Sequence, residues 1–415
     1  MVACRPTLGL EDGPIRMDIV VVGHVDHGKS TLIGRLLYDS GNITEGRVEE
    51  LQKLAEEYKR RFEFAYFLDS FDDELKEERT IDTTGVMFKG KNLYSITDVP
   101  GHKEFIKNML TGASHADMAV LVVAAEEGIQ EQTGRHAFLI HMLGIKQLFV
   151  VVNKMDAVGY REEVFQSIKT EIAQLLSSFG YHDVEFIPGS AREGDNIYKR
   201  SEQMGWYHGP TLIEALDRVK LGKKAKALRF VVQDTYLVDS GKVIVGRVES
   251  GVLYKGDKVI FHPSGVSGKI EEIKIFGGVI EKAEAGDSMG IIANCEPRRG
   301  DVCGLVQNPP IPVDEFLGEA VLLEDRLRKG ETVELRCGTR RVSSVIKEIR
   351  DKINSETGEV MDRYPDYISQ HEAATIVFAT EPLVVEKFSE IPELGRFLLV
   401  RGKNIGAGVV LEAHK

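Results

Sequence analysis

The 415-residue sequence predicts a doubly wound α/β domain with a mostly parallel sheet, followed by two small antiparallel β-barrels. The first domain is predicted because apolar, β-branched runs alternate with amphipathic helical stretches over residues 16–222. After residue 226, short alternating strands are separated by turn glycines, and a proline-rich stretch divides them into two groups. We therefore expect a flexible tail over 1–15, the α/β domain over 16–222, and barrels over 226–309 and 312–415.

Five apolar runs are the expected strands of the α/β domain, and they lie at 19–22, 93–97, 118–123, 148–152 and 184–187. Several of them are rich in β-branched residues, as is usual for parallel strands that are buried on both faces. Between the first two runs, apolar residues over 48–62 recur at intervals of three and four, which predicts a helix with a charged outer face.

Composition narrows the class of protein. Lys and Arg number 53 against 65 Asp and Glu, a net charge of −12, so the whole-chain charge does not indicate a nucleic-acid binder. The four cysteines, Cys4, Cys295, Cys303 and Cys337, lack the spacing of a zinc site or a disulfide framework. No apolar run reaches the roughly 18 residues of a membrane span. We expect a soluble, cytoplasmic protein.

A phosphate-binding loop is predicted directly after the first strand, because residues 23–30 match G-x-x-x-x-G-K-[ST]. Backbone N–H groups of such a loop surround phosphates, the Lys29 ammonium reaches the β- and γ-phosphates, and the Ser30 hydroxyl is placed to bind Mg²⁺. The candidate residues are Gly23, His24, Val25, Asp26, His27, Gly28, Lys29, Ser30 and Thr31.

A second motif, Asp-Val-Pro-Gly-His over 98–102, follows the second expected strand. Asp98 can hold a water on Mg²⁺, and the Gly101 amide can meet the γ-phosphate. A lone histidine is usually a surface residue, but the place of His102 directly after this motif favours a role in positioning the attacking water.

A third motif, Asn-Lys-Met-Asp over 153–156, follows the fourth expected strand and is the predicted base reader. Asp156 can accept hydrogen bonds from the N1–H and the 2-amino group of guanine, which adenine does not offer, while the stem of Lys154 packs over the ring. Asn153 belongs to the same motif. Ser190, Ala191 and Arg192 follow the last strand and can bring a backbone N–H to the guanine O6. Together these motifs predict a GTP-binding and GTP-hydrolysing domain that uses GTP or GDP with Mg²⁺.

The motifs, together with the stretch Phe-Ile-Lys-Asn-Met over 105–109, resemble those of the translation-factor class of GTPases. The resemblance covers the whole chain and implies the P-loop GTPase fold followed by two β-barrels. Within this class the chain is similar both to the elongation factors that carry aminoacyl-tRNA and to the GTPase subunit of heterodimeric bacterial sulfate adenylyltransferase.

Three stretches, 194–212 with the single Trp206, 337–342 and 351–357, look closer to the sulfate-activating subunit. This resemblance implies a partner, a catalytic ATP-sulfurylase subunit that forms adenylyl sulfate from ATP and sulfate in sulfate assimilation, with GTP hydrolysis here driving that reaction. Nucleic acid is then not an expected partner. The alternative is an elongation factor that delivers aminoacyl-tRNA to the ribosome in a GTP-dependent manner.

Two departures are visible, one from the sulfate-activating subunits and one from the whole translation-factor class. The sulfate-activating subunits commonly have Asn and Asp at the positions of His24 and His27, so the phosphate loop of this chain has the sequence pattern of the elongation factors. In the first switch segment, Arg79 is followed directly by Thr80, and four residues that the class carries are absent. Thr80 still aligns with the threonine that binds Mg²⁺ in the class, so the resemblance implies a Mg²⁺ site of Ser30, Thr80 and Asp98.

Overall fold

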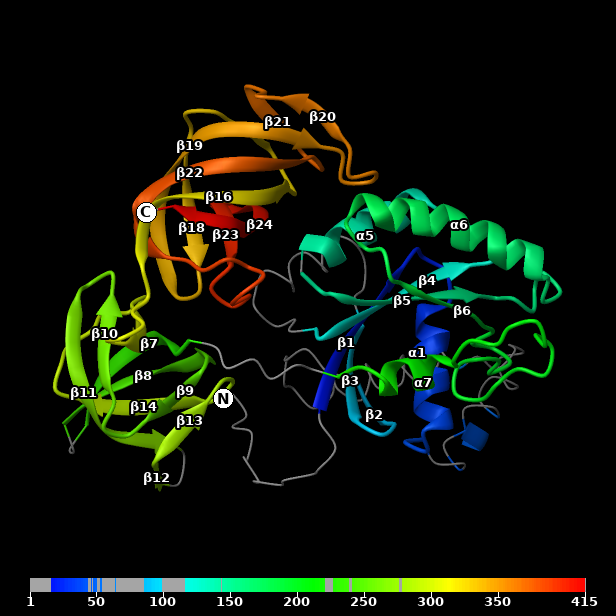
Figure 1. The fold of residues 1–415 in the computed structure, drawn as a ribbon, viewed down its shortest axis with the longest axis horizontal. Coiled ribbons are helices and arrows are strands. Elements are labelled where there is room, and N and C mark those ends of the chain that lie inside the picture. Colours follow the sequence, from blue (N-terminus) through cyan, green and yellow to red (C-terminus); the bar gives the residue numbers. More distant parts are fainter. Residues whose placement is uncertain are drawn as a thin grey trace. The chain divides into compact units, whose positions relative to one another are not determined.

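A computed structural model describes residues 16–43, 46, 48–50, 53, 64, 86–98, 116–142, 144–220, 227–238, 241–275 and 278–414. The chain divides into two compact units (Figure 1). Of the residues that the structure describes, one unit comprises those within 16–220 and 356–358, and the other comprises those within 227–355 and 359–414.

The first unit is built on a six-stranded sheet in the order β2-β3-β1-β4-β5-β6. Only β2 is antiparallel to its neighbour; the other pairings are parallel. Every residue of β4 is buried, because helices cover both faces of the sheet. The strands are β1 Arg16–Gly23, β2 Val86–Lys89, β3 Leu93–Asp98, β4 Met118–Ala124, β5 Gln147–Asn153 and β6 Glu185–Pro188.

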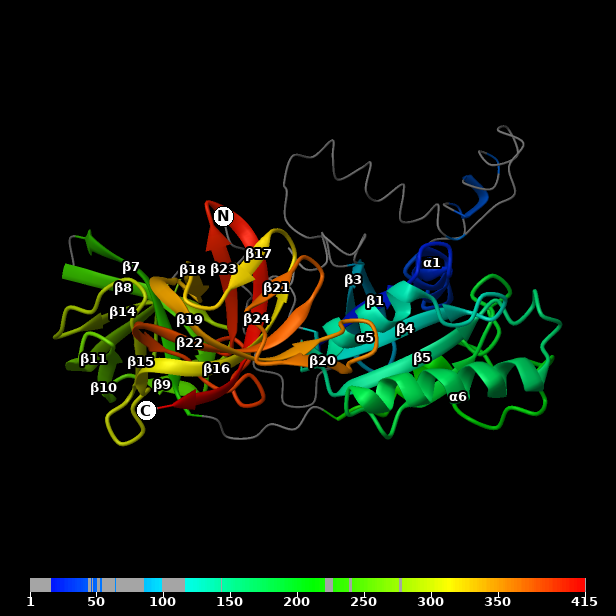
Figure 2. The same ribbon diagram turned by 90° about the horizontal axis from the view of Figure 1, so that it is seen from above.

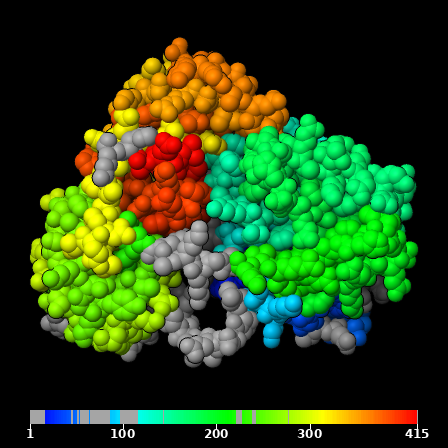
Figure 3. Space-filling view, viewed as in Figure 1, coloured from blue at the N-terminus to red at the C-terminus, as the bar shows by residue number. Residues whose placement is uncertain are grey.

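Helices lie on both faces of this sheet, with α1 and α7 on one side and α5 and α6 on the other (Figure 1). Leu32 and Leu36 of α1 are buried in one core cluster with Val21 of β1. The turned view shows α6 running along the sheet beside β5 (Figure 2). In this unit, the segment from α6 to α7 forms much of the surface seen in Figure 3. The helices are α1 Lys29–Asp39, α5 Glu131–Met142, α6 Glu162–Ser178 and α7 Leu212–Asp217.

The five predicted strands are confirmed as β1, β3, β4, β5 and β6. The edge strand β2 was not predicted, because it is short and only Phe88 of its four residues is buried. Of the helix predicted over 48–62, Val48, Glu49, Glu50 and Lys53 are helical, and the other positions lie outside the described residues. No helix in the described ranges is long and apolar enough to cross a membrane.

The second unit begins with a seven-stranded antiparallel sheet in the order β10-β15-β7-β8-β14-β11-β12. A further pairing of β10 with β11 closes this sheet into a barrel around Phe230, Val259 and Phe261. A separate two-stranded ribbon pairs β9 with β13. The strands are β7 Arg229–Val238, β8 Gly241–Ser250, β9 Val252–Tyr254, β10 Lys258–His262, β11 Val266–Ile275, β12 Gly278–Ile280, β13 Lys282–Glu284, β14 Ser288–Ala293 and β15 Val302–Leu305.

A second barrel follows, with strand order β18-β23-β24-β16-β22-β19-β20 and closure between β18 and β19. Phe316, Phe378 and Phe397 fill its core, with ring centroids 5.0–5.4 Å apart. A Cβ on Gly408 would lie 2.4 Å from the Phe397 ring, so this strand position requires glycine. The strands are β16 Pro312–Leu322, β17 Arg326–Arg328, β18 Thr332–Cys337, β19 Arg340–Ile353, β20 Val360–Arg363, β21 Tyr367–Ser369, β22 Ala373–Val384, β23 Arg396–Arg401 and β24 Lys403–His414.

The two barrels are joined within the second unit by a buried ion pair. Arg229 Nε lies 2.5 Å from Glu386 Oε1, and the two side chains are 6% and 18% exposed. The Thr339 hydroxyl also donates to the carbonyl of Val232 at 2.8 Å. The predicted fold class, an α/β P-loop domain followed by two β-barrels, is confirmed.

Candidate nucleotide-binding site

The loop between β1 and α1 is shaped by residues with positive φ. Asp26 has a φ of 62° and Gly28 has a φ of 86°. A Cβ on Gly28 would lie 2.4 Å from Nδ2 of Asn153, so only glycine fits there. Ser30 and Thr31, at the start of α1, line the adjoining pocket. Because a helix N-terminus attracts anions, this arrangement suits a bound phosphate.

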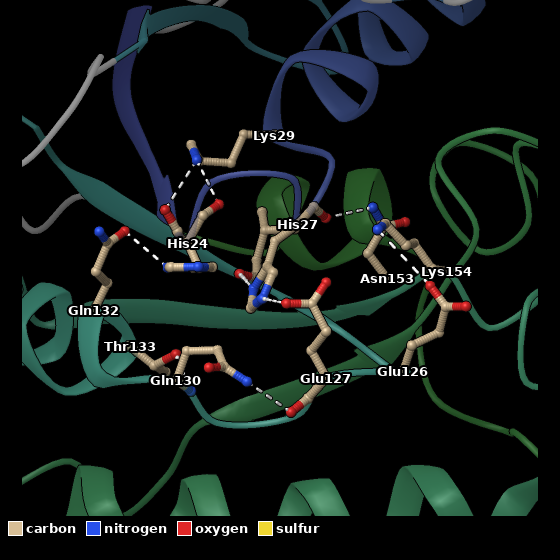
Figure 4. Close-up of polar contacts among 12 residues, drawn as sticks. His24, His27, Lys29, Glu126, Glu127, Gln130, Gln132, Thr133, Asn153 and Lys154 are labelled. Carbon is tan, nitrogen blue, oxygen red and sulfur yellow. Dashed lines mark hydrogen bonds and ion pairs between the residues drawn. The ribbon is translucent and has the colours of Figure 1, made fainter.

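The Lys29 side chain folds back over the phosphate loop, so that its ammonium contacts backbone carbonyls of the same loop. Its Nζ donates to the carbonyl of Gly23 at 2.9 Å and to that of His24 at 2.8 Å (Figure 4). Lys29 also lines the pocket. The loop therefore holds a cation where phosphate charge is expected.

Asn153, the last residue of β5, connects the phosphate loop to the loop over 189–195, which we call the base loop. Its side chain is buried; Nδ2 donates to the carbonyl of His27, and Oδ1 accepts from the N–H of Ala191, both at 2.9 Å. Figure 4 shows the first of these bonds. Removing the amide leaves buried backbone groups unpaired. Asn153 therefore fixes the spacing of the two loops.

Asp156 carries a buried oxygen without a donor. Among the described residues, Asp156 Oδ1 is shielded from solvent and accepts no hydrogen bond. A buried acceptor left unpaired costs about 1–3 kcal/mol, so the site favours a ligand that brings N–H groups. Guanine offers two adjacent donors, its N1–H and its 2-amino group. The chemistry of this residue therefore fits guanine.

The base loop is closed by hydrogen bonds of its own. Ser190 N–H donates to Asp195 O at 3.1 Å, Gly194 N–H donates to Ser190 O at 2.8 Å, and Glu193 N–H donates to Ser190 Oγ at 3.2 Å. The Ala191 N–H is already used by Asn153, so it is not free for a ligand in this structure. Ser190 and Arg192 line the pocket.

Lys154 and Glu126 face one another across the pocket lining. Lys154 has a φ of 62°, and its ammonium lies 3.8 Å from the Glu126 carboxylate (Figure 4). This pair holds the lysine stem along the wall of a pocket of about 880 Å³. The volume lies within the range usual for small-molecule sites, roughly 300–1,000 Å³.

The two histidines of the phosphate loop pack against one another and against the strand ends. Their ring centroids are 5.2 Å apart, and His24 Nδ1 lies 2.9 Å from Gln132 Oε1. His27 is buried, with Nδ1 3.3 Å from the carbonyl of Val122 and Nε2 3.5 Å from Glu127 (Figure 4). Burial lowers the pKa of His27 and so favours its neutral form. The contacts of these two rings fix the phosphate loop against the end of β4 and the residues that follow it.

The segment around Trp206 supports the loop that carries Asp156. Trp206 Nε1 donates to the carbonyl of Tyr160 at 3.0 Å, and its ring lies 5.5 Å from that of Phe165. The Tyr160 N–H in turn donates to the carbonyl of Met155 at 2.8 Å. Trp206 is therefore a packing residue of the base side of the site.

Three predicted site residues, Thr80, Gly101 and His102, lie outside the described residues, as does the stretch 105–109. Asp98 is described only through its backbone, which pairs with Val21 at the end of β3. Within the described ranges, no cluster of three or more His, Cys, Asp or Glu side chains could hold a metal ion. A Mg²⁺ ion bound through phosphates, waters and a hydroxyl does not need such a cluster.

Sequence reasoning missed Phe64 and Glu126, which line the pocket, and Arg35, which contacts the base loop. No motif marks them. The chain separation between Arg35 and Ala191, 156 positions, leaves no local signal of their contact.

The fold and the site together define a P-loop guanine-nucleotide-binding protein with two appended β-barrels. Three family models match the chain: the elongation factor Tu GTP-binding domain over 15–221, elongation factor Tu domain 2 over 241–304, and the GTP-eEF1A C-terminal domain-like family over 319–411. The match thus extends over all three structural parts.

Similar proteins match the chain over nearly its whole length. Elongation factor 1-alpha of Methanothrix thermoacetophila is 44% identical, with 96% of this chain and 98% of the relative covered. Elongation factor 1-alpha of Methanothermobacter thermautotrophicus is 43% identical, with 95% and 97% covered. A crystal structure of sup35 complexed with GMPPNP is 25% identical, covers 97% of this chain and 95% of that chain, and has a TM-score of 0.46. The chain belongs to the elongation factor Tu/elongation factor 1-alpha family of translation-factor GTPases.

These findings overturn the expected role in sulfate activation. The full-length relatives carry the name elongation factor 1-alpha, so neither a sulfate adenylyltransferase complex nor a catalytic ATP-sulfurylase partner is supported. The expectation rested on stretches whose side chains serve packing: Trp206 supports the base side of the site, and Cys337 is buried in the core of the second barrel. Such positions carry no information about a partner.

The expectation that nucleic acid is not a partner is also contradicted, because the relatives are named elongation factor 1-alpha. It rested largely on the net charge of −12, which is a property of the whole chain. RNA is bound by local Lys and Arg contacts to phosphates, and these can occur on a protein of negative net charge.

Proposed function

We propose that this chain is a translation elongation factor that binds aminoacyl-tRNA in its GTP form and releases it on the ribosome after GTP hydrolysis. The observation that carries the proposal is the match to elongation factor 1-alpha at 41–44% identity across nearly the whole chain. The guanine-compatible pocket of the first unit supports it.

In the proposed site, the loop from Gly23 to Thr31 surrounds the phosphates with backbone N–H groups, and Lys29 supplies the cation. Asn153 holds the phosphate and base loops together, Lys154 covers the ring, and Asp156 accepts the two guanine donors. In the proposal, the N–H of Arg192 meets O6, because the N–H groups of Ser190 and Ala191 already donate to the Asp195 carbonyl and to Asn153 Oδ1.

Mg²⁺, when bound, would neutralise charge between the β- and γ-phosphates. In the proposal, Ser30, Thr80 and Asp98 would hold Mg²⁺, and the Gly101 amide would contact the γ-phosphate. His102 orients the attacking water. The first switch, around Thr80, and the second, around Gly101, then report which nucleotide is bound.

The proposed domain division assigns GTP binding to 16–222, after a tail over 1–15. The barrels over 226–309 and 312–415 would present the surfaces that contact aminoacyl-tRNA.

The test is binding of fluorescently labelled aminoacyl-tRNA to the chain loaded with a non-hydrolysable GTP analogue or with GDP. We expect tight binding in the GTP form, much weaker binding in the GDP form, and weak binding of deacylated tRNA. The affinity should fall steeply with salt, because RNA phosphates are neutralised by Lys and Arg. Equal, weak binding in both nucleotide states would refute the proposal.

A further inference from the structure

Arg35 reaches from the helix that follows the phosphate loop to the base loop. Its Nε donates to the carbonyl of Ala191 at 3.0 Å, and its Nη2 donates to the carbonyl of Arg192. A planar guanidinium can make two such bonds at once from a fixed geometry. One side chain thus joins α1 to two consecutive peptides of the base loop.

The guanidinium is itself held in place. Its central carbon lies 3.8 Å from the centroid of the Phe64 ring, and Nη1 lies 3.8 Å from an Asp39 oxygen one turn later in α1. The Arg35 side chain is only 11% exposed. Burial lowers its pKa from the ordinary value, but an arginine remains charged at neutral pH. An aromatic face, an ion pair and two carbonyls therefore restrict this side chain to one position.

The contacts of Arg35 complement those of Asn153. Asn153 receives the N–H of Ala191, while Arg35 donates to the carbonyl of the same residue. The peptides on both sides of Ala191 are therefore anchored, one to β5 and one to α1. Neither anchor lies within the loop, whose internal bonds close it but do not orient it toward the pocket.

Arg35 does not line the nucleotide pocket. It lines an adjoining pocket of about 660 Å³, which shares Asp156 and Glu193 with the first. Arg35 therefore reaches the nucleotide only through its neighbours, which are the base loop that accepts its two hydrogen bonds and the Phe64 ring on which it stacks.

We propose that Arg35 is a positioning residue for guanine recognition: by holding the carbonyls of Ala191 and Arg192, it places the base-loop N–H that meets the O6 atom. The inference rests on the proposed guanine site. It assigns to α1 a second role, because the helix that begins at the phosphate loop also sets the geometry of base reading.

The test measures three dissociation constants for each variant, for GDP, 6-thioguanosine diphosphate and inosine diphosphate. The thio analogue replaces O6 with sulfur, a weak acceptor, and keeps the N1–H and the 2-amino group. Inosine keeps O6 and lacks the 2-amino group that Asp156 reads. The preference for GDP over the thio analogue therefore reports the O6 contact, and the preference for GDP over inosine diphosphate reports Asp156.

For Arg35→Ala we expect GDP affinity to fall about tenfold, the loss of roughly one hydrogen bond. Binding of the thio analogue should change little, so that preference collapses toward one, while the preference over inosine diphosphate stays. Arg35→Lys keeps the charge but not the planar pair of donors, and it should fall between Arg35→Ala and the unaltered chain. Arg218→Ala, an exposed arginine of the same unit, is the matched control and should change none of the three constants.

Two results would overturn the assignment. One is that none of the three dissociation constants changes in either Arg35 variant. The other is an equal loss of affinity for all three nucleotides, which leaves the preferences unchanged and is what a purely structural role would produce. If Arg35→Ala does not fold, Arg35→Lys gives the answer. Failure of the unaltered chain to bind GDP is a different result and would count against the proposed function itself.

Discussion

Replacement of Asp156 by asparagine perturbs the residue proposed to read the base. Asp156 Oδ1 is buried and accepts no hydrogen bond from the described residues, so a bound guanine would supply its partners. Hydrogen bonds to a charged group contribute about 1.5–3 kcal/mol each. Losing two of them costs roughly 3–6 kcal/mol and weakens GDP binding by about 10²–10⁴-fold. The new amide instead donates to the C2 carbonyl of xanthine, so preference should move to xanthosine diphosphate.

The assay is displacement of a fluorescent GDP analogue by GDP and by xanthosine diphosphate. Asp183→Asn is the matched control, because Asp183 is an exposed carboxylate of the same unit. The control should keep the preference for GDP. If Asp156→Asn lost affinity for both nucleotides equally, with an unchanged circular dichroism spectrum, the reasoning would be refuted.

Three further predictions address chemistry and stability. His102→Ala should keep GTP binding and slow single-turnover hydrolysis by about 10²-fold or more; an unchanged rate would remove the residue from the mechanism. Burial raises the pKa of Glu319 from 4.5 to about 7. The protonated carboxyl contributes stability that is complete below pH 4.5 and is lost as the pH rises through about 7. Glu319→Gln should therefore stabilise the fold by about 3 kcal/mol at pH 8 and by little at pH 4. Equal gains in the free energy of unfolding at both pH values would contradict this. Arg229→Ala should destabilise the second unit by about 3–5 kcal/mol, since it leaves the Glu386 carboxylate buried and unpaired. Additive losses in a double-mutant cycle with Glu386→Gln, measured by denaturant unfolding, would argue against coupling.

Much of the first unit could be predicted because its signals are local. The five strands are continuous apolar runs, and Gly28 and Lys29 belong to a motif of fixed spacing whose backbone geometry follows from its glycines. The edge strand β2 was missed because it is short and lies at the sheet edge, where only Phe88 of its four residues is buried. Local pattern thus predicted the elements and the phosphate loop.

The supports of the site could not be predicted, because they join distant parts of the chain. Asn153 was recognised as part of a motif, but its bonds to His27 and Ala191 follow only from the parallel order of β1, β5 and β6. Arg35 has no motif at all. Its partners lie 156 and 157 positions away, and only the folded sheet brings them together.

The choice between two relatives failed for a different physical reason. The stretches around Trp206 and Cys337 are constrained by packing against Phe165 and in the second barrel core, respectively. Residues selected for packing can be alike in proteins with different partners. The partner is determined by exposed surface, which short sequence stretches describe poorly.

The measurement that tests the central claim most directly is GTP hydrolysis by the aminoacyl-tRNA complex on ribosomes of the organism that encodes the chain. The complex, loaded with radiolabelled GTP, is mixed with ribosomes whose codon either matches or does not match the tRNA, and phosphate release is followed over a single turnover. The account predicts slow hydrolysis without ribosomes and a large acceleration that requires both the aminoacyl-tRNA and the matching codon. Hydrolysis that ribosomes leave unchanged, or that proceeds equally with the wrong codon or without tRNA, would contradict it.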